Sequence, residues 1–144
     1  MPNFTGQLKT TSSSQTIVSC NDTPGHQIVL RWANAQQSCS DPLFHNTRHN
    51  STGVADLTNG NGQEHGYFTN EHSSGDRESG TWEGNITTSG NQVTFQGTWK
   101  YTYGTGQFAG ISGNGKFTGR MLSGNEWEVS FEGSYQLKAG TRAA

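Results

Sequence analysis

The stretch 93-VTFQGTWKYTY-103 alternates apolar or glycine residues with polar ones. In an extended chain, neighbouring side chains point to opposite faces, so one face would carry every second residue. That face would hold Val93, Phe95, Gly97, Trp99, Tyr101 and Tyr103. The stretch 127-WEVSFEGSYQL-137 repeats the pattern with Trp127, Val129, Phe131, Gly133, Tyr135 and Leu137. Both stretches predict long antiparallel strands with one buried and one solvated face.

Weaker alternation predicts six more strands, and turn signals rich in Gly, Asn and Ser separate them. The six strands are expected at residues 15–19, 27–32, 53–57, 64–72, 80–87 and 115–122. About eight strands joined by short turns favour a meander, and closure into a barrel removes its unpaired edges. We therefore expect an all-β protein, a single closed antiparallel β-barrel domain of about eight strands spanning residues 1–144.

The composition agrees with such a domain and excludes several classes of function. The chain has 144 residues, a net charge of −2, 20 glycines and 28% hydrophobic residues. The few basic residues are scattered, which argues against nucleic-acid binding, and no apolar run could form a membrane helix. The N-terminus has no signal-peptide pattern, which favours the cytoplasm, although a chain whose signal had been removed would look the same.

The stretch 33-ANAQQSCSDPLFHNTRHNS-51 is polar and irregular, and it predicts a long loop or lid. His45 and His49 are expected there as solvated histidines rather than as metal ligands. Residues 138–144 are expected to form a flexible tail. Cys20 and Cys39 could form a disulfide in an exported protein or stay reduced and buried in a cytosolic one. No metal site is expected, because no CxxC or CxH spacing is present.

The glycines of 110-GISGNGKF-117 have the spacing of a phosphate-binding P-loop. The motif requires Ser or Thr after the lysine and then a helix, whereas here Phe117 follows and the next residues look like a strand. We therefore exclude nucleotide binding. Glycine inside strands marks bends and close backbone contacts, which a small barrel needs.

The longer run 104-GTGQFAGISGNGKFTG-119 resembles the glycine signature of the allene oxide cyclase barrel-like family, a group of calycin-type small β-barrels. GTW at 97–99 and 75-GDRESGTWEG-84 also fit, so the resemblance covers residues 64–137. It implies an eight-stranded antiparallel barrel with an apolar central cavity. Some relatives are plant isomerases that cyclise an unsaturated fatty-acid epoxide, and others are bacterial cyclases of polyketide-like substrates. Residues 1–50 match nothing in this pattern.

The aromatic residues are the best candidates for a binding site, because an apolar cavity with a few polar groups is the usual form of a small-molecule site. We expect five to bind substrate: Trp32, Trp82, Trp99, Phe131 and Tyr135. The alternative is that they simply fill the barrel. Tyr101, Tyr103 and His72 are the candidate catalytic groups. His65 and His72 have opposite parity on their strand, so only one can face inward.

These features predict a cofactor-independent isomerase or cyclase acting on a small hydrophobic substrate inside the barrel. Arg31 could hold an anionic group of a ligand. The alternative is a non-enzymatic, lipocalin-like carrier, and a third hypothesis is an interaction module with a filled interior that forms a homo-oligomer. Cavity volume separates the third hypothesis from the first two. A buried polar group with a perturbed pKa separates the enzyme from the carrier. No nucleic acid or membrane is expected as a partner.

Overall fold

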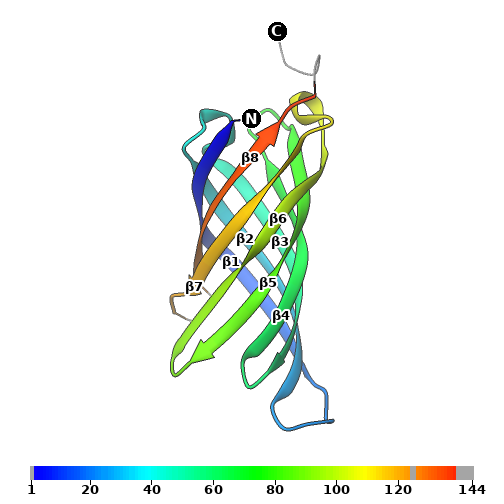
Figure 1. Cartoon of the computed structure of the whole chain (residues 1–144), viewed down its shortest axis with the longest axis vertical. Helices are drawn as coiled ribbons and strands as arrows, with labels where there is room; N and C mark the ends of the chain where they lie inside the picture. The colour runs from blue at the N-terminus through cyan, green and yellow to red at the C-terminus, as the bar shows by residue number, and fades with distance from the viewer. Residues whose placement is uncertain (1, 124–125, 139–144) are drawn as a thin grey trace.

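A computed structural model describes residues 2–123 and 126–138 as eight antiparallel strands that close into one barrel (Figure 1). The strands are β1 (Asn3–Ser19), β2 (His26–Cys39), β3 (Thr47–Thr58), β4 (Asn61–Glu71), β5 (Arg77–Ser89), β6 (Gln92–Gly104), β7 (Ser112–Met121) and β8 (Trp127–Gln136). Each strand pairs with the next, and β1 pairs with β8 to close the ring. The predicted all-β barrel of about eight strands with meander topology is confirmed.

The long loop expected over residues 33–51 is wrong for most of its length. Residues 33–39 belong to β2 and residues 47–51 to β3, so only 40–46 connects the two strands. The inner positions of this part of β2 are Ala33, Ala35 and Gln37, all buried. Small and polar inward residues lack the apolar alternation that marks a strand in the sequence. Of the expected tail, residues 139–144 lie outside the described residues.

Two short 3-10 helices cover the end of the barrel where the N-terminus lies (Figure 1). They are η1 (Pro42–Phe44), between β2 and β3, and η2 (Gly106–Phe108), between β6 and β7. Phe44 and Phe108 are fully buried, and their ring centroids are 5.7 Å apart. Gln37 Nε2 donates to the carbonyl oxygen of Phe44 at 3.0 Å. The connection therefore closes this end with an aromatic plug.

Glycines inside the barrel make room for aromatic rings from other strands. A Cβ atom on Gly53 would lie 2.4 Å from Cζ2 of Trp82, and one on Gly66 would lie 2.6 Å from the same atom. Such contacts are too short for any side chain, so the indole of Trp82 occupies the space that β3 and β4 leave open. Glycine at these two positions therefore allows ring packing in a narrow interior.

Two expected inward residues lie on the outside. In β6 a bulge leaves Thr102 unpaired, because Tyr101 pairs with Gly80 and Tyr103 with Ser79. The extra residue reverses the alternation, so Tyr103 is 63% exposed. Trp32 is 41% exposed, because the buried neighbour Ala33 takes the inner position on β2. Trp32 was expected to bind substrate inside the barrel and Tyr103 to act in catalysis there. Both expectations are wrong, because both side chains lie on the outside.

The two cysteines are both free thiols. Cys39 is the last residue of β2, whereas Cys20 precedes that strand at its other end. At about 3.3 Å per residue the strand separates them by roughly 40 Å, far more than a disulfide can span. A disulfide between Cys20 and Cys39 is therefore incompatible with this barrel. Within the described ranges, no helix is long and apolar enough to cross a membrane.

Candidate active site

A cavity of about 120 Å³ lies inside the barrel, with walls from all eight strands. Its aromatic walls are Phe68, Trp82, Phe95, Trp99, Tyr101, Phe117, Trp127 and Phe131. Three of the expected substrate-binding residues, Trp82, Trp99 and Phe131, therefore line it. Tyr135 instead belongs to the plug, where its hydroxyl donates to Asp41 Oδ2 at 2.8 Å. A dry cavity of about 150 Å³ can hold benzene, so this interior suits a molecule of about one ring.

Glu64 is a buried carboxyl group in this aromatic cavity. It points inward from β4, is only 6% exposed, and its Oε2 lies 3.9 Å from Nη1 of Arg31. Burial raises the pKa of Glu64 to about 7, and the positive charge of Arg31 opposes that rise only in part. A carboxyl group with this pKa exists in both protonation states at neutral pH. It can therefore both donate and accept a proton there.

A chain of four hydrogen-bonded side chains runs from the plugged end to the cavity. His72 Nε2 bonds Glu78 Oε2, and Asn70 Nδ2 donates to Glu78 Oε1 at 3.0 Å. His49 Nδ1 lies 2.8 Å from Asn70 Oδ1. Glu78 is fully buried and Asn70 is 3% exposed. Burial raises the pKa of Glu78, while the bonds from His72 and Asn70 oppose the rise.

The hydrogen bonds of this chain fix the tautomer of His49. Asn70 donates its amide N–H to Glu78, so its Oδ1 must accept from His49. The proton of the neutral imidazole is therefore on Nδ1, and Nε2 is left as an acceptor. Burial lowers the pKa of His49 to about 4, although the bond to Asn70 opposes the shift. The expectation that His49 is a solvated loop residue is wrong, because it lies buried on β3 and lines the cavity.

The expected catalytic residues Tyr101 and His72 have different positions. Tyr101 lines the cavity, and burial, with the nearby charge of Glu78, raises its pKa well above the usual value. Its phenol therefore keeps its proton. His72 faces inward, as its parity allows, but it stacks on Phe108 with 4.4 Å between ring centroids and is not part of the cavity wall. His65 is exposed.

Two tryptophans offer further polar groups. The indole Nε1 atoms of Trp82 and Trp99 are buried, and within the described part of the chain neither has a hydrogen-bond partner. An unpaired buried donor costs free energy. Because both residues line the cavity, a polar atom of a bound molecule or a water could satisfy these donors.

Sequence reasoning did not select Glu64 or the chain from His49 to His72. The signal was present, because Glu64, Phe68, Asn70 and His72 share one parity on the predicted strand 64–72. A glutamate at the start of a strand is usually solvated, and only the partner strands show that this one is covered. Neither a scan of protein-family models nor a search of curated proteins finds a match for the chain.

The two buried titrating groups should give opposite pH dependences of stability. His49 takes up a proton near pH 6.5 when unfolded but only near 4 when folded, so its contribution is lost as the pH falls through that window. Glu64 ionises near pH 4.5 when unfolded but near 7 when folded, so its contribution is lost as the pH rises. Each effect amounts to about 3 kcal/mol.

We therefore expect the free energy of unfolding of Glu64→Gln to rise with pH between about 4.5 and 6.5, relative to the wild type. His49→Gln should show the opposite slope. Urea unfolding at a series of pH values measures both, and His65→Gln is the matched control, because His65 is exposed. Parallel curves for all three variants would contradict the burial of both groups.

Proposed function

We propose that this protein is a cofactor-independent isomerase or cyclase that acts on a compact, mostly apolar substrate inside the barrel. The observation that carries the proposal is Glu64, whose pKa of about 7 places a carboxyl group that is half protonated at neutral pH against an aromatic wall. Perturbed pKa values of this kind concentrate at catalytic sites. The glycine run resembling the allene oxide cyclase barrel-like family points to the same class of reaction.

In this mechanism, Glu64 moves the proton. As a carboxylate it removes a proton from an activated C–H bond of the substrate, and as a carboxylic acid it returns the proton at another atom. Alternatively, the acid form protonates an oxygen, such as that of an epoxide, as the C–O bond opens and the ring closes, and the resulting carboxylate then removes a proton from a carbon of the cyclised cation. In both cases Glu64 regains its initial state, so no net oxidant or reductant is needed.

Arg31 and the aromatic side chains position the substrate. The guanidinium of Arg31 lies beside Glu64 and can hold an oxygen of the substrate on which negative charge develops. The indole N–H groups of Trp82 and Trp99 supply two further donors. The rings around them fix the conformation of a flexible chain, which lowers the entropic part of the barrier.

The size of the cavity restricts the substrate class. A volume of about 120 Å³ fits a single ring or a short unsaturated chain rather than a long lipid. The guanidinium of Arg31 and the carboxyl group of Glu64 favour a molecule with one oxygen function, such as an enone, a small epoxide or a carboxylic acid. A carrier would need the same cavity but not a carboxyl group that titrates near pH 7.

Two measurements test the proposal. Native mass spectrometry followed by extraction identifies any molecule that copurifies with the protein. NMR in D₂O then follows a panel of compact β,γ-unsaturated carbonyl compounds and epoxides, together with the extracted molecule. We expect isomerised product that carries solvent deuterium where a C–H proton has moved, and Trp99→Ala should slow its formation.

Binding without turnover for every compound would support the lipocalin-like carrier instead. A protein that copurifies with nothing and takes up no apolar fluorescent probe would contradict both the enzyme and the carrier. It would then favour the interaction module with a packed interior.

A further inference from the structure

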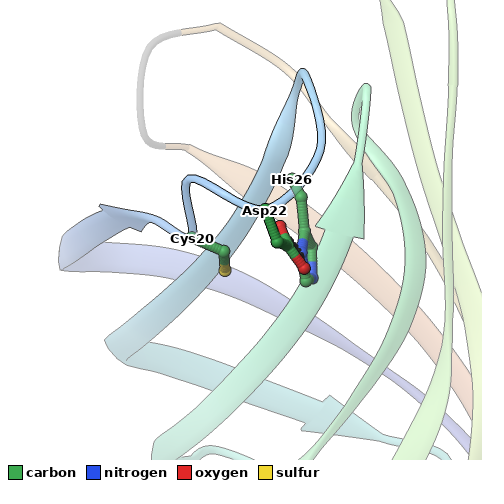
Figure 2. A group of neighbouring side chains, drawn as sticks. All are labelled: Cys20, Asp22 and His26. Carbon is green, nitrogen blue, oxygen red and sulfur yellow. Dashed lines mark hydrogen bonds and ion pairs between the residues drawn. The ribbon is translucent and has the colours of Figure 1, made fainter.

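The loop between β1 and β2 brings three different metal-binding side chains together, at the end of the barrel opposite the aromatic plug (Figures 1 and 2). One donor atom each from Cys20, Asp22 and His26 lies within 4.8 Å of the other two. We propose that these residues bind a divalent transition-metal ion, and that zinc is the ion that their donor set fits best. This site is separate from the cavity and does not depend on the proposed function.

The donor types select the metal. A thiolate, an imidazole and a carboxylate are the three ligand types of zinc sites, whereas calcium and magnesium prefer oxygen alone. Zinc bonds of about 2.0–2.3 Å place donor atoms about 3–4 Å apart in a tetrahedral site. Asp22 Oδ1 already lies 2.7 Å from His26 Nδ1, so an ion entering between them requires only a small displacement. Three protein ligands leave a fourth position for water.

Asp56 from β3 completes the arrangement as an outer partner. His26 Nε2 hydrogen bonds Asp56 Oδ1, on the opposite side of the ring from Asp22. Histidines that bind a metal through one nitrogen usually donate the other N–H to a carboxylate, which orients the ring. With Nε2–H on Asp56, Nδ1 of His26 is the nitrogen available to the ion.

The backbone holds the loop in this shape. Cys20 N donates to the carbonyl oxygen of His26 at 3.0 Å, and Asn59 N donates to that of Gly25 at 3.0 Å. Asn21 and Gly25 adopt positive φ angles of 61° and 78°. The turn after β3 therefore supports the loop, and the donors do not need to be gathered from a freely moving segment.

The charges also favour a cation. Burial, together with the carboxylates of Asp22 and Asp56, raises the pKa of the Cys20 thiol. The hydrogen bonds that His26 makes to the carboxylates of Asp22 and Asp56 raise the pKa of its imidazole. A dication would offset the repulsion among the carboxylates and the thiolate and would displace the protons from Cys20 and His26. Metal binding should therefore strengthen as the pH rises.

The test uses untagged full-length protein, freed of metal by chelation, with cobalt(II) and zinc(II) as probes. We expect one equivalent of cobalt(II) to give a near-ultraviolet thiolate-to-cobalt absorption band that zinc(II) abolishes, with tighter binding at about pH 8 than at about pH 6. Cys20→Ser should remove the band. Asp56→Asn should weaken zinc binding roughly 10- to 100-fold, because Asp56 only orients His26.

Cys39→Ser and His65→Gln are the matched controls, because Cys39 lies at the other end of β2 and His65 is exposed on β4. Both should bind cobalt(II) like the wild type, and circular dichroism confirms that every variant is folded. The proposal is wrong if no saturable binding occurs up to millimolar metal, or if the band survives in Cys20→Ser. His26 would then be only an imidazolium held between two aspartates.

Discussion

Glu64→Gln should lower turnover at neutral pH by about 100- to 10,000-fold while leaving substrate affinity nearly unchanged. The amide has almost the same shape as the carboxyl group and can still hydrogen bond, but it cannot take up or release a proton. Wild-type turnover should change with pH near 7, where Glu64 titrates, and the residual activity of the variant should lack that transition. Steady-state kinetics over a pH series, with a substrate found by the NMR panel, measures both effects.

The matched control is Glu83→Gln. Glu83 is exposed on β5, next to Trp82 in sequence but on the outer face of the barrel. Its substitution should leave turnover unchanged. If Glu64→Gln kept full turnover, or if its only defect were weaker binding, Glu64 would not transfer the proton, and Arg31 with the aromatic walls would form a binding site alone.

The strands whose inner faces carry large side chains could be predicted from the sequence. β6 and β8 alternate aromatic residues with polar ones, and both were expected within one residue of their observed bounds. β1 shows the limit, because it runs from Asn3 to Ser19 whereas only 15–19 was expected. Its inner positions include Gly6 and Thr10. Because these residues are not large and apolar, this strand lacks the alternation of hydrophobic and polar residues that identifies a strand in the sequence.

The position of single side chains depends on features that local alternation does not contain. One bulged residue, Thr102, separates inward Tyr101 from outward Tyr103. Trp32 lies outside although it is larger than its neighbours, and the inner position of β2 belongs to Ala33. Interior volume is shared by all eight strands, so rings from other strands decide how much room β2 has.

The polar site could not be derived from the sequence for a related reason. Glu64 is unusual only because neighbouring strands bury it and place Arg31 beside it. The chain from His49 to His72 joins residues from β3, β4 and β5 with the segment after β4, and these contacts follow from the pairing register. A single sequence gives the parity of each residue but not the register that brings such residues together.

Glu78→Ala should lower the free energy of unfolding by about 3–5 kcal/mol. Glu78 is fully buried, and it accepts from Asn70 while also bonding His72. Removing its side chain leaves polar groups of both partners without a hydrogen bond in the protein interior, and it also opens a void where the carboxyl group was buried. Urea unfolding at neutral pH measures the loss.

Glu78→Gln separates the hydrogen bonds from the charge. Its amide oxygen can accept from Asn70, and its amide N–H can donate to His72 Nε2, so we expect a change of less than about 1 kcal/mol. A loss as large as that of Glu78→Ala would mean that the negative charge, rather than the hydrogen bonds, stabilises the four hydrogen-bonded side chains.

Nitrogen NMR of His49 adds a second readout. In Glu78→Ala the Asn70 amide can rotate and no longer fixes the Nδ1–H tautomer, whereas Glu78→Gln should preserve it, since Asn70 still donates to residue 78 and accepts from His49.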